Sequence, residues 1–156
     1  MTTTATKVQT KWETKKIQDS TARVIASIWI SAYQTLSKYG QEAHQEFANK
    51  VNSFKVEHYK SLGIKTPIEL VKAMAEMEYN LFGSEIEISG DEKRAEIKHN
   101  TCGMWNAMQQ LGKFTPEQEE KLGKNFQESL SQLAKEFGFK SEAKMEKDTC
   151  VVTFTK

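Results

Sequence analysis

Apolar positions in the N-terminal part of the chain recur at helical spacing. No Gly or Pro occurs between about Trp12 and Tyr39, and few apolar residues precede Ile17. The repeating positions are Ile17, Val24, Ile25, Ile28, Trp29, Ala32, Tyr33 and Leu36. This pattern predicts a long amphipathic helix that ends at Gly40, and we expect its first turns to project from the domain or to contact a second subunit.

A second helix is predicted from about Gln41 to Leu62. Its stripe at intervals of three and four consists of His44, Phe47, Val51, Phe54, His58 and Leu62, which we interpret as the core-facing side. At the helical rise, the two histidines of this stripe are ~21 Å apart, so they cannot belong to one metal site. A third helix, from the capping sequence Thr66-Pro67-Ile68-Glu69 to about Phe82, follows.

After Gly83 the hydrophobic period changes from 3.6 to 2, which is typical of strands. Residues 85–88 and 94–99 alternate around the turn-like sequence 89–92, and residues 142–146 and 149–155 alternate around Lys147-Asp148. Two helical runs, from about Cys102 to Leu111 and from Thr115 to Gly138, separate the two pairs. The predicted fold class is therefore α+β, a four-stranded antiparallel sheet of two hairpins with one face covered by about five helices.

Composition narrows the class of protein. A length of 156 residues predicts a disordered segment over 1–10 and a single α+β domain over 11–156. The 22 Lys and Arg residues nearly balance 21 Asp and Glu, so nucleic acid is not an expected partner. No secretory signal and no membrane span are apparent, so we expect no membrane partner and a cytoplasmic protein with two free thiols.

Candidate chemistry gathers where the third histidine meets the two cysteines. Alternation places His99 with Ala95 and Ile97, and Cys150 with Val152 and Phe154, on the inner side of the sheet. Cys102 follows three residues after the histidine, at a helix start where amide donors and the helix dipole lower a thiol's pKa.

One interpretation makes Cys102 a nucleophile and His99 its base, for acyl transfer or for opening a C=N-containing ring. A second makes His99, Cys102 and Cys150 ligands of a zinc-like ion, with Asp148 or a water completing the shell. The third is a core edge with two ordinary thiols and a hydrogen-bonded imidazole. Trp105, on the same helix face as Cys102, is either a pocket wall or an aromatic plug in the core.

The segment from Glu96 to Phe154 resembles the L-2-amino-thiazoline-4-carboxylic acid hydrolase-like family. The resemblance lies in Cys102-x-x-Trp105, Gly112 and the closing Asp148-Thr-Cys150-x-x-x-Phe154. More distantly, the segment is similar to the 4-vinyl reductase-type small-molecule-binding domain. The resemblance implies an α+β domain with a pocket between helices and sheet and, in some members, hydrolysis of a cyclic amidine-like bond.

We therefore expect a small-molecule-binding domain, with hydrolysis of a cyclic C–N bond through Cys102 and His99 as its possible activity. Trp105, Cys150 and His58 are the candidate ligand-binding residues; no metal ligand is assigned and the cofactor is unknown. The alternatives are a non-enzymatic metal- or ligand-sensing regulatory domain and a homodimeric interaction protein that pairs through the long first helix.

Overall fold

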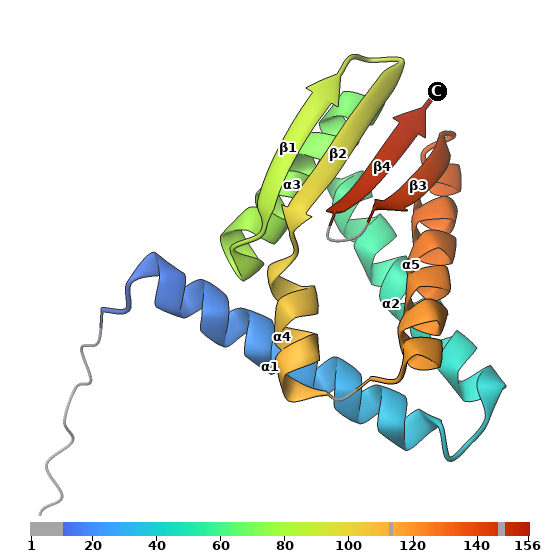
Figure 1. The fold of residues 1–156 in the computed structure, drawn as a ribbon. Helices are drawn as coiled ribbons and strands as arrows, with labels where there is room; N and C mark the ends of the chain where they lie inside the picture. Colours follow the sequence, from blue (N-terminus) through green and yellow to red (C-terminus); the bar gives the residue numbers. More distant parts are fainter. Residues whose placement is uncertain (1–10, 113, 147–148) are drawn as a thin grey trace, which may run out of the picture.

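The computed structural model describes residues 11–112, 114–146 and 149–156. The predicted disordered segment 1–10 and the predicted turn at 147–148 lie outside these residues. The elements are α1 (Thr14–Leu36), α2 (Gln41–Ser61), α3 (Pro67–Phe82), β1 (Glu85–Gly90), β2 (Arg94–Thr101), α4 (Gly103–Leu111), α5 (Pro116–Glu136), β3 (Lys140–Glu146) and β4 (Thr149–Thr155). The predicted α+β class is confirmed (Figure 1).

The four strands form one antiparallel sheet in the order β1-β2-β4-β3. Both predicted hairpins are present, and the sheet joins them through the pairing of β2 with β4. On the inner face, Ala95 and Ile97 of β2 and Val152 and Phe154 of β4 are fully buried. Period-two alternation therefore sets which side chains face the core.

Three helices cover this inner face. The main core cluster combines side chains of α2, α3 and α5 with those of the central strands, and Figure 1 shows these helices behind the sheet. A smaller cluster joins Ala22 and Ala26 of α1 to Ala107 of α4, near the end of the sheet where β2 finishes. The small side chains allow these two helices to approach closely.

The predicted inward face of α2 is wrong in its C-terminal half. Phe54 and Leu62 are 71% and 55% exposed, His58 is exposed, and the buried residue is instead Tyr59. Asn52 faces α5, where it donates to the Gln132 side chain. In this half of α2 the polar Asn52 therefore faces inward, and the apolar Phe54 and Leu62 are exposed to solvent.

The face of α1 also differs from the predicted stripe. Ile17, Val24 and Ile28 are 47%, 57% and 55% exposed, whereas Gln18 is buried with the two alanines. The Gln18 amide donates to the main-chain oxygen of Tyr79 at 2.8 Å, which satisfies its polar group inside the fold. An apolar stripe of α1 is consequently left exposed beside its polar residues. None of the described helices combines the length and apolar character needed to span a bilayer.

Candidate functional site

Glu78 is a carboxylate on the buried side of α3. The helix begins with a capping box, in which the Thr66 side chain accepts from the Glu69 amide and the Glu69 carboxylate accepts from Thr66. Val71 and Met74 define its core face, and residue 78 follows them by seven and four positions. Helical geometry therefore directs Glu78 inward. This residue is not among the predicted site residues, although its spacing from Val71 and Met74 indicates an inward position.

His99 is the hydrogen-bond partner of this carboxylate. It is 5% exposed on β2, and its Nε2 lies 2.9 Å from Oε2 of Glu78. With the carboxylate ionised, Nε2 carries the proton of this hydrogen bond. The other ring nitrogen, Nδ1, is buried and has no hydrogen-bond partner among the described residues.

The register of the sheet pairs Cys150 of β4 directly with His99. Directly opposed residues have neighbouring side chains on one face, so the predicted juxtaposition of imidazole and thiol is confirmed. Burial, together with smaller contributions from the nearby Cys102 and Glu78 as negative neighbours, raises the pKa of the Cys150 thiol to about 11. This thiol is poorly ionised at neutral pH.

Cys102 caps the N-terminus of α4, as its Sγ accepts from the Trp105 amide at 3.5 Å. Burial raises the pKa of its thiol and outweighs the amide donors of Trp105 and Met104, while Glu78 raises it too. The predicted lowering of the Cys102 pKa is therefore wrong: the helix start acts in the expected direction, but desolvation is larger.

Gly103 fixes the junction between β2 and α4. Its amide donates to the buried Ser84 hydroxyl at 3.1 Å, and a Cβ at this position would overlap the main-chain oxygen of Phe82. The end of α3 and the start of α4 are thus held in direct contact. This contact brings Cys102 toward Glu78.

No hydrogen bond joins His99 to either thiol within residues 11–112, 114–146 and 149–156. The predicted base and nucleophile are near the same carboxylate but are not bonded to each other. In the same ranges, no group of three or more His, Cys, Asp and Glu side chains could hold a metal ion. The alternative ligand Asp148 lies outside the described residues.

Of the other predicted ligand-binding residues, Trp105 adjoins the cluster through the hydrogen bond that its amide donates to Cys102, whereas His58 lies elsewhere. Trp105 is half-buried and stacks on Phe114, with ring centroids 6.1 Å apart. His58 lines a shallow groove of about 280 Å³ between α2 and α3, together with Phe54 and Met77. The structure therefore does not bring His58 to His99.

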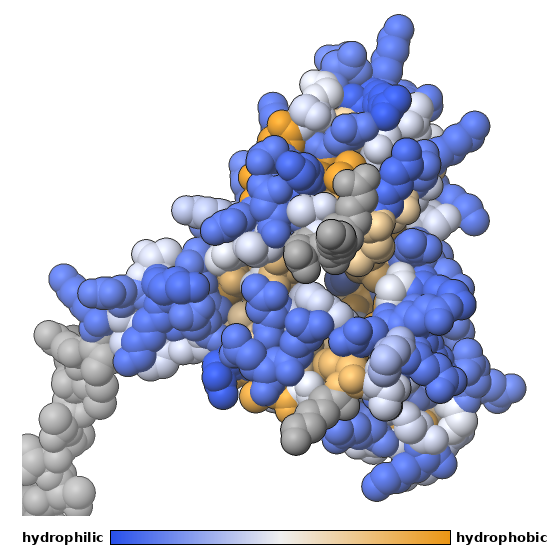
Figure 2. All heavy atoms as spheres, viewed as in Figure 1, coloured by the Kyte–Doolittle hydropathy of each residue, from blue (hydrophilic) through white to orange (hydrophobic). Residues whose placement is uncertain are grey.

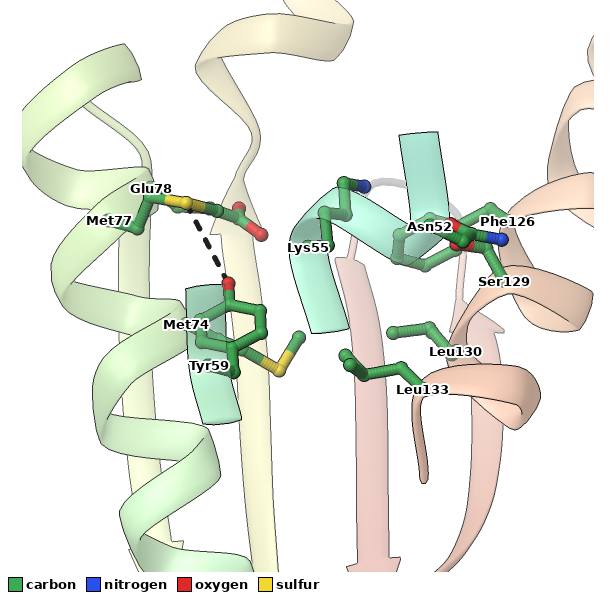
Figure 3. A pocket seen from close by; sticks show the side chains of 10 residues that line it. All are labelled: Asn52, Lys55, Tyr59, Met74, Met77, Glu78, Phe126, Ser129, Leu130 and Leu133. Carbon is green, nitrogen blue, oxygen red and sulfur yellow. Dashed lines mark hydrogen bonds between the residues drawn. The ribbon is translucent and has the colours of Figure 1, made fainter. Parts of the chain in front are cut away.

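A small pocket of about 50 Å³ reaches Glu78 from between α2, α3 and α5 (Figure 3). Its lining residues are Asn52, Lys55, Tyr59, Met74, Met77, Glu78, Phe126, Ser129, Leu130 and Leu133. Figure 2 shows the face of the molecule hollowed below the sheet as drawn, with apolar side chains in the wall of the hollow. The volume holds a few water molecules or a very small ligand.

Two charged residues line this pocket. Glu78 comes from α3 and Lys55 from α2, and the walls around them are largely apolar (Figure 3). Lys55 as a whole is exposed, yet the protein around its ammonium lowers its pKa by desolvation, and Glu78 partly offsets this shift. Burial also raises the pKa of Tyr59, whose hydroxyl donates to the Met77 sulfur at 3.7 Å.

Glu78 is therefore the common element of the site, because it influences the pKa of Lys55, Tyr59, Cys102 and Cys150 and is bonded to His99. Comparison with models of known protein families gives no match, and comparison with curated proteins gives none either.

Proposed function

We propose that this protein is a small-molecule-binding domain whose ligand enters the pocket between α2, α3 and α5 and contacts Glu78. The observation that carries the proposal is the Glu78–His99 pair at 2.9 Å, with side chains only 18% and 6% exposed. Placing ionisable groups inside a core costs free energy unless they are well paired. The pair here remains incomplete, because Nδ1 of His99 lacks a described partner.

Ionisable groups with displaced pKa values gather at binding and active sites, since such sites need charge in a poorly solvated place. Lys55, Cys102 and Cys150 all have displaced pKa values, and Glu78 contributes to each. Because a single carboxylate that lines the pocket affects all three pKa values, these shifts support a binding site at this pocket.

The size of the pocket limits the ligand. Sites for drug-sized molecules measure roughly 300–1,000 Å³, far above the present 50 Å³. A ligand of a few heavy atoms fits, and a larger one requires the Phe126 wall on α5 to move. Hydrolysis through Cys102 and His99, which the resemblance implies, lacks a supporting hydrogen bond, so binding is the function proposed.

Ligand-observed NMR with a library of small fragments tests this function. We expect a subset of fragments to bind the unmodified protein and the Glu76→Gln variant, but not Glu78→Gln. Glu76 is the matched control because it is an exposed carboxylate on the same helix. If no fragment binds, or if binding is indifferent to Glu78, the proposal is wrong.

The exposed apolar side of α1 supports a second proposal, that two copies of the chain associate through this helix. Ile17, Val24 and Ile28 follow each other by seven and four positions, so they form one narrow seam suited to pairing with an identical helix. Sedimentation equilibrium should show a dimer that Val24→Lys weakens and that Gln34→Lys, an exposed change away from the seam, does not. A monomer at high concentration excludes this arrangement.

A further inference from the structure

We infer that Lys55 forms an imine with a small uncharged aldehyde or ketone that enters the pocket between α2, α3 and α5. The inference rests on the proposed binding function and names the class of ligand. It concerns a nucleophilic group that no part of the sequence analysis singled out.

The position of Lys55 makes it available for such a reaction. It lines both the small pocket and the neighbouring groove, and it is exposed where the two meet. In the described part of the chain its ammonium has no hydrogen bond or salt bridge. Two lysines of the same helix differ, since Lys50 pairs with Glu46 at 2.9 Å and Lys60 with Glu136 at 2.7 Å.

The surroundings favour the neutral amine, which is the form that attacks a carbonyl group. Tyr59, Met77 and Phe126, which line the same pocket as Lys55, present mainly apolar surface to it (Figure 3). Desolvation by these neighbours lowers the pKa of Lys55, so a larger fraction of this lysine is free amine at neutral pH than of a lysine without such neighbours.

Glu78, which lines the same pocket from α3, supplies the acid–base partner that imine formation needs. The amine nitrogen attacks the carbonyl carbon to give a carbinolamine, and the nitrogen loses a proton. Protonation of the carbinolamine hydroxyl then releases water as the C=N bond forms, so one water leaves for each imine. A carboxyl group that exchanges its proton within the pocket accelerates both transfers, and His99 holds this carboxyl in place.

Charge and shape define the ligand class. Among the described residues that line the pocket, Glu78 is the only anionic side chain, and it repels the carboxylate of an oxo acid once the lysine charge is lost in a neutral imine. The small pocket accepts the carbonyl end, and the groove of about 280 Å³ beside it, lined by Val51, Phe54 and Met77, accepts a short alkyl chain.

The test is reductive trapping with propanal and sodium cyanoborohydride at pH 7, followed by peptide mapping by mass spectrometry. We expect Lys55 to gain a propyl group at least about tenfold faster than Lys50 and Lys60 in the same sample. Glu78→Gln should slow the reaction at Lys55, and Glu76→Gln should not. Lys55→Arg keeps a cation but should remove the fast site.

The outcomes separate this inference from the proposed function. If all three lysines react at similar rates while fragments still bind in a Glu78-dependent manner, the imine is excluded and the binding function stands. If neither selective trapping nor fragment binding occurs, both are wrong. Circular dichroism of each variant ensures that a lost signal does not come from unfolding, and a folded Lys55→Arg variant that still traps propanal fast at another lysine also overturns the inference.

Discussion

Replacing Gly103 by Ala tests the junction that brings Cys102 toward Glu78. A Cβ on residue 103 would overlap the Phe82 carbonyl oxygen and lie 2.8 Å from its carbon. Carbon atoms prefer separations of about 3.5–4.0 Å, so the ends of α3 and α4 must separate by close to 1 Å or more. The hydrogen bond from the Gly103 amide to Ser84 at 3.1 Å would be stretched or lost.

The expected loss of stability combines two effects. Overpacking costs about 1–3 kcal/mol, and an unsatisfied buried polar group costs about 1–3 kcal/mol. We therefore expect the free energy of unfolding to fall by about 2–6 kcal/mol for Gly103→Ala. The matched control is Gly123→Ala in α5, where a Cβ meets nothing within 4 Å and the helix should gain about 0.5–1 kcal/mol.

Urea unfolding followed by circular dichroism measures both variants against the unmodified protein. Gly103→Ala should unfold at clearly lower urea concentration, and Gly123→Ala at equal or higher concentration. If the two variants unfold together, residue 103 does not hold α3 against α4 in the way described, and the position of Cys102 needs another explanation.

Three further predictions concern the polar cluster and a helix cap. His99→Leu should lower the free energy of unfolding by about 1–3 kcal/mol because it leaves the Glu78 carboxylate without its partner. Adding Glu78→Leu should recover much of this loss in the same urea assay. A double variant as unstable as His99→Leu would contradict the pairing. The Cys150 pKa rises from the ordinary 9.0 to about 11 on folding. The contribution of this thiol to the free energy of unfolding is therefore fully present below pH 9 and is lost as the pH rises toward 11. Thermal unfolding across this range should show a shallower decline for Cys150→Ala, and an identical decline would refute the shift. Thr66→Ala should cost about 1 kcal/mol by removing the side-chain cap of α3, and an unchanged urea midpoint would show that this cap is dispensable.

The strands could be predicted well from the sequence because alternation carries two pieces of information at once. It gives the element type and also the face, so His99 and Cys150 were placed on the inner side from Ala95, Ile97, Val152 and Phe154 alone. Capping residues similarly marked the starts of α3 and α5. These are local rules that packing did not override.

The helix faces could not be predicted as well, because a helix can carry apolar residues on two sides. In α2 the polar Asn52 faces α5 through hydrogen bonds, so the inward face is rotated away from Phe54 and His58. In α1 the alanines pack inward because the space against α4 is narrow, which leaves Val24 outside. Hydrophobicity alone gives no measure of the space between helices.

Glu78 and Lys55 could be found only in part. The spacing from Val71 and Met74 pointed the carboxylate inward, but its partner is 21 residues away on another element. Lys55 reads as an ordinary surface lysine on a charged helix, and only the approach of α3 and α5 gives it apolar neighbours. Cys102 is likewise desolvated by residues distant in the sequence, so the direction of its pKa shift could not be predicted from the neighbouring residues alone.

The pairing of β2 with β4 has a kinetic consequence. The first hairpin forms from neighbouring residues, but α4, α5 and β3 lie between the two central strands along the chain. Closing such a long loop costs entropy, so we expect the joining of the two hairpins to limit the folding rate. Until that step, the unpaired edge of β2 is open to other chains, and aggregation during refolding should depend on protein concentration in this interval.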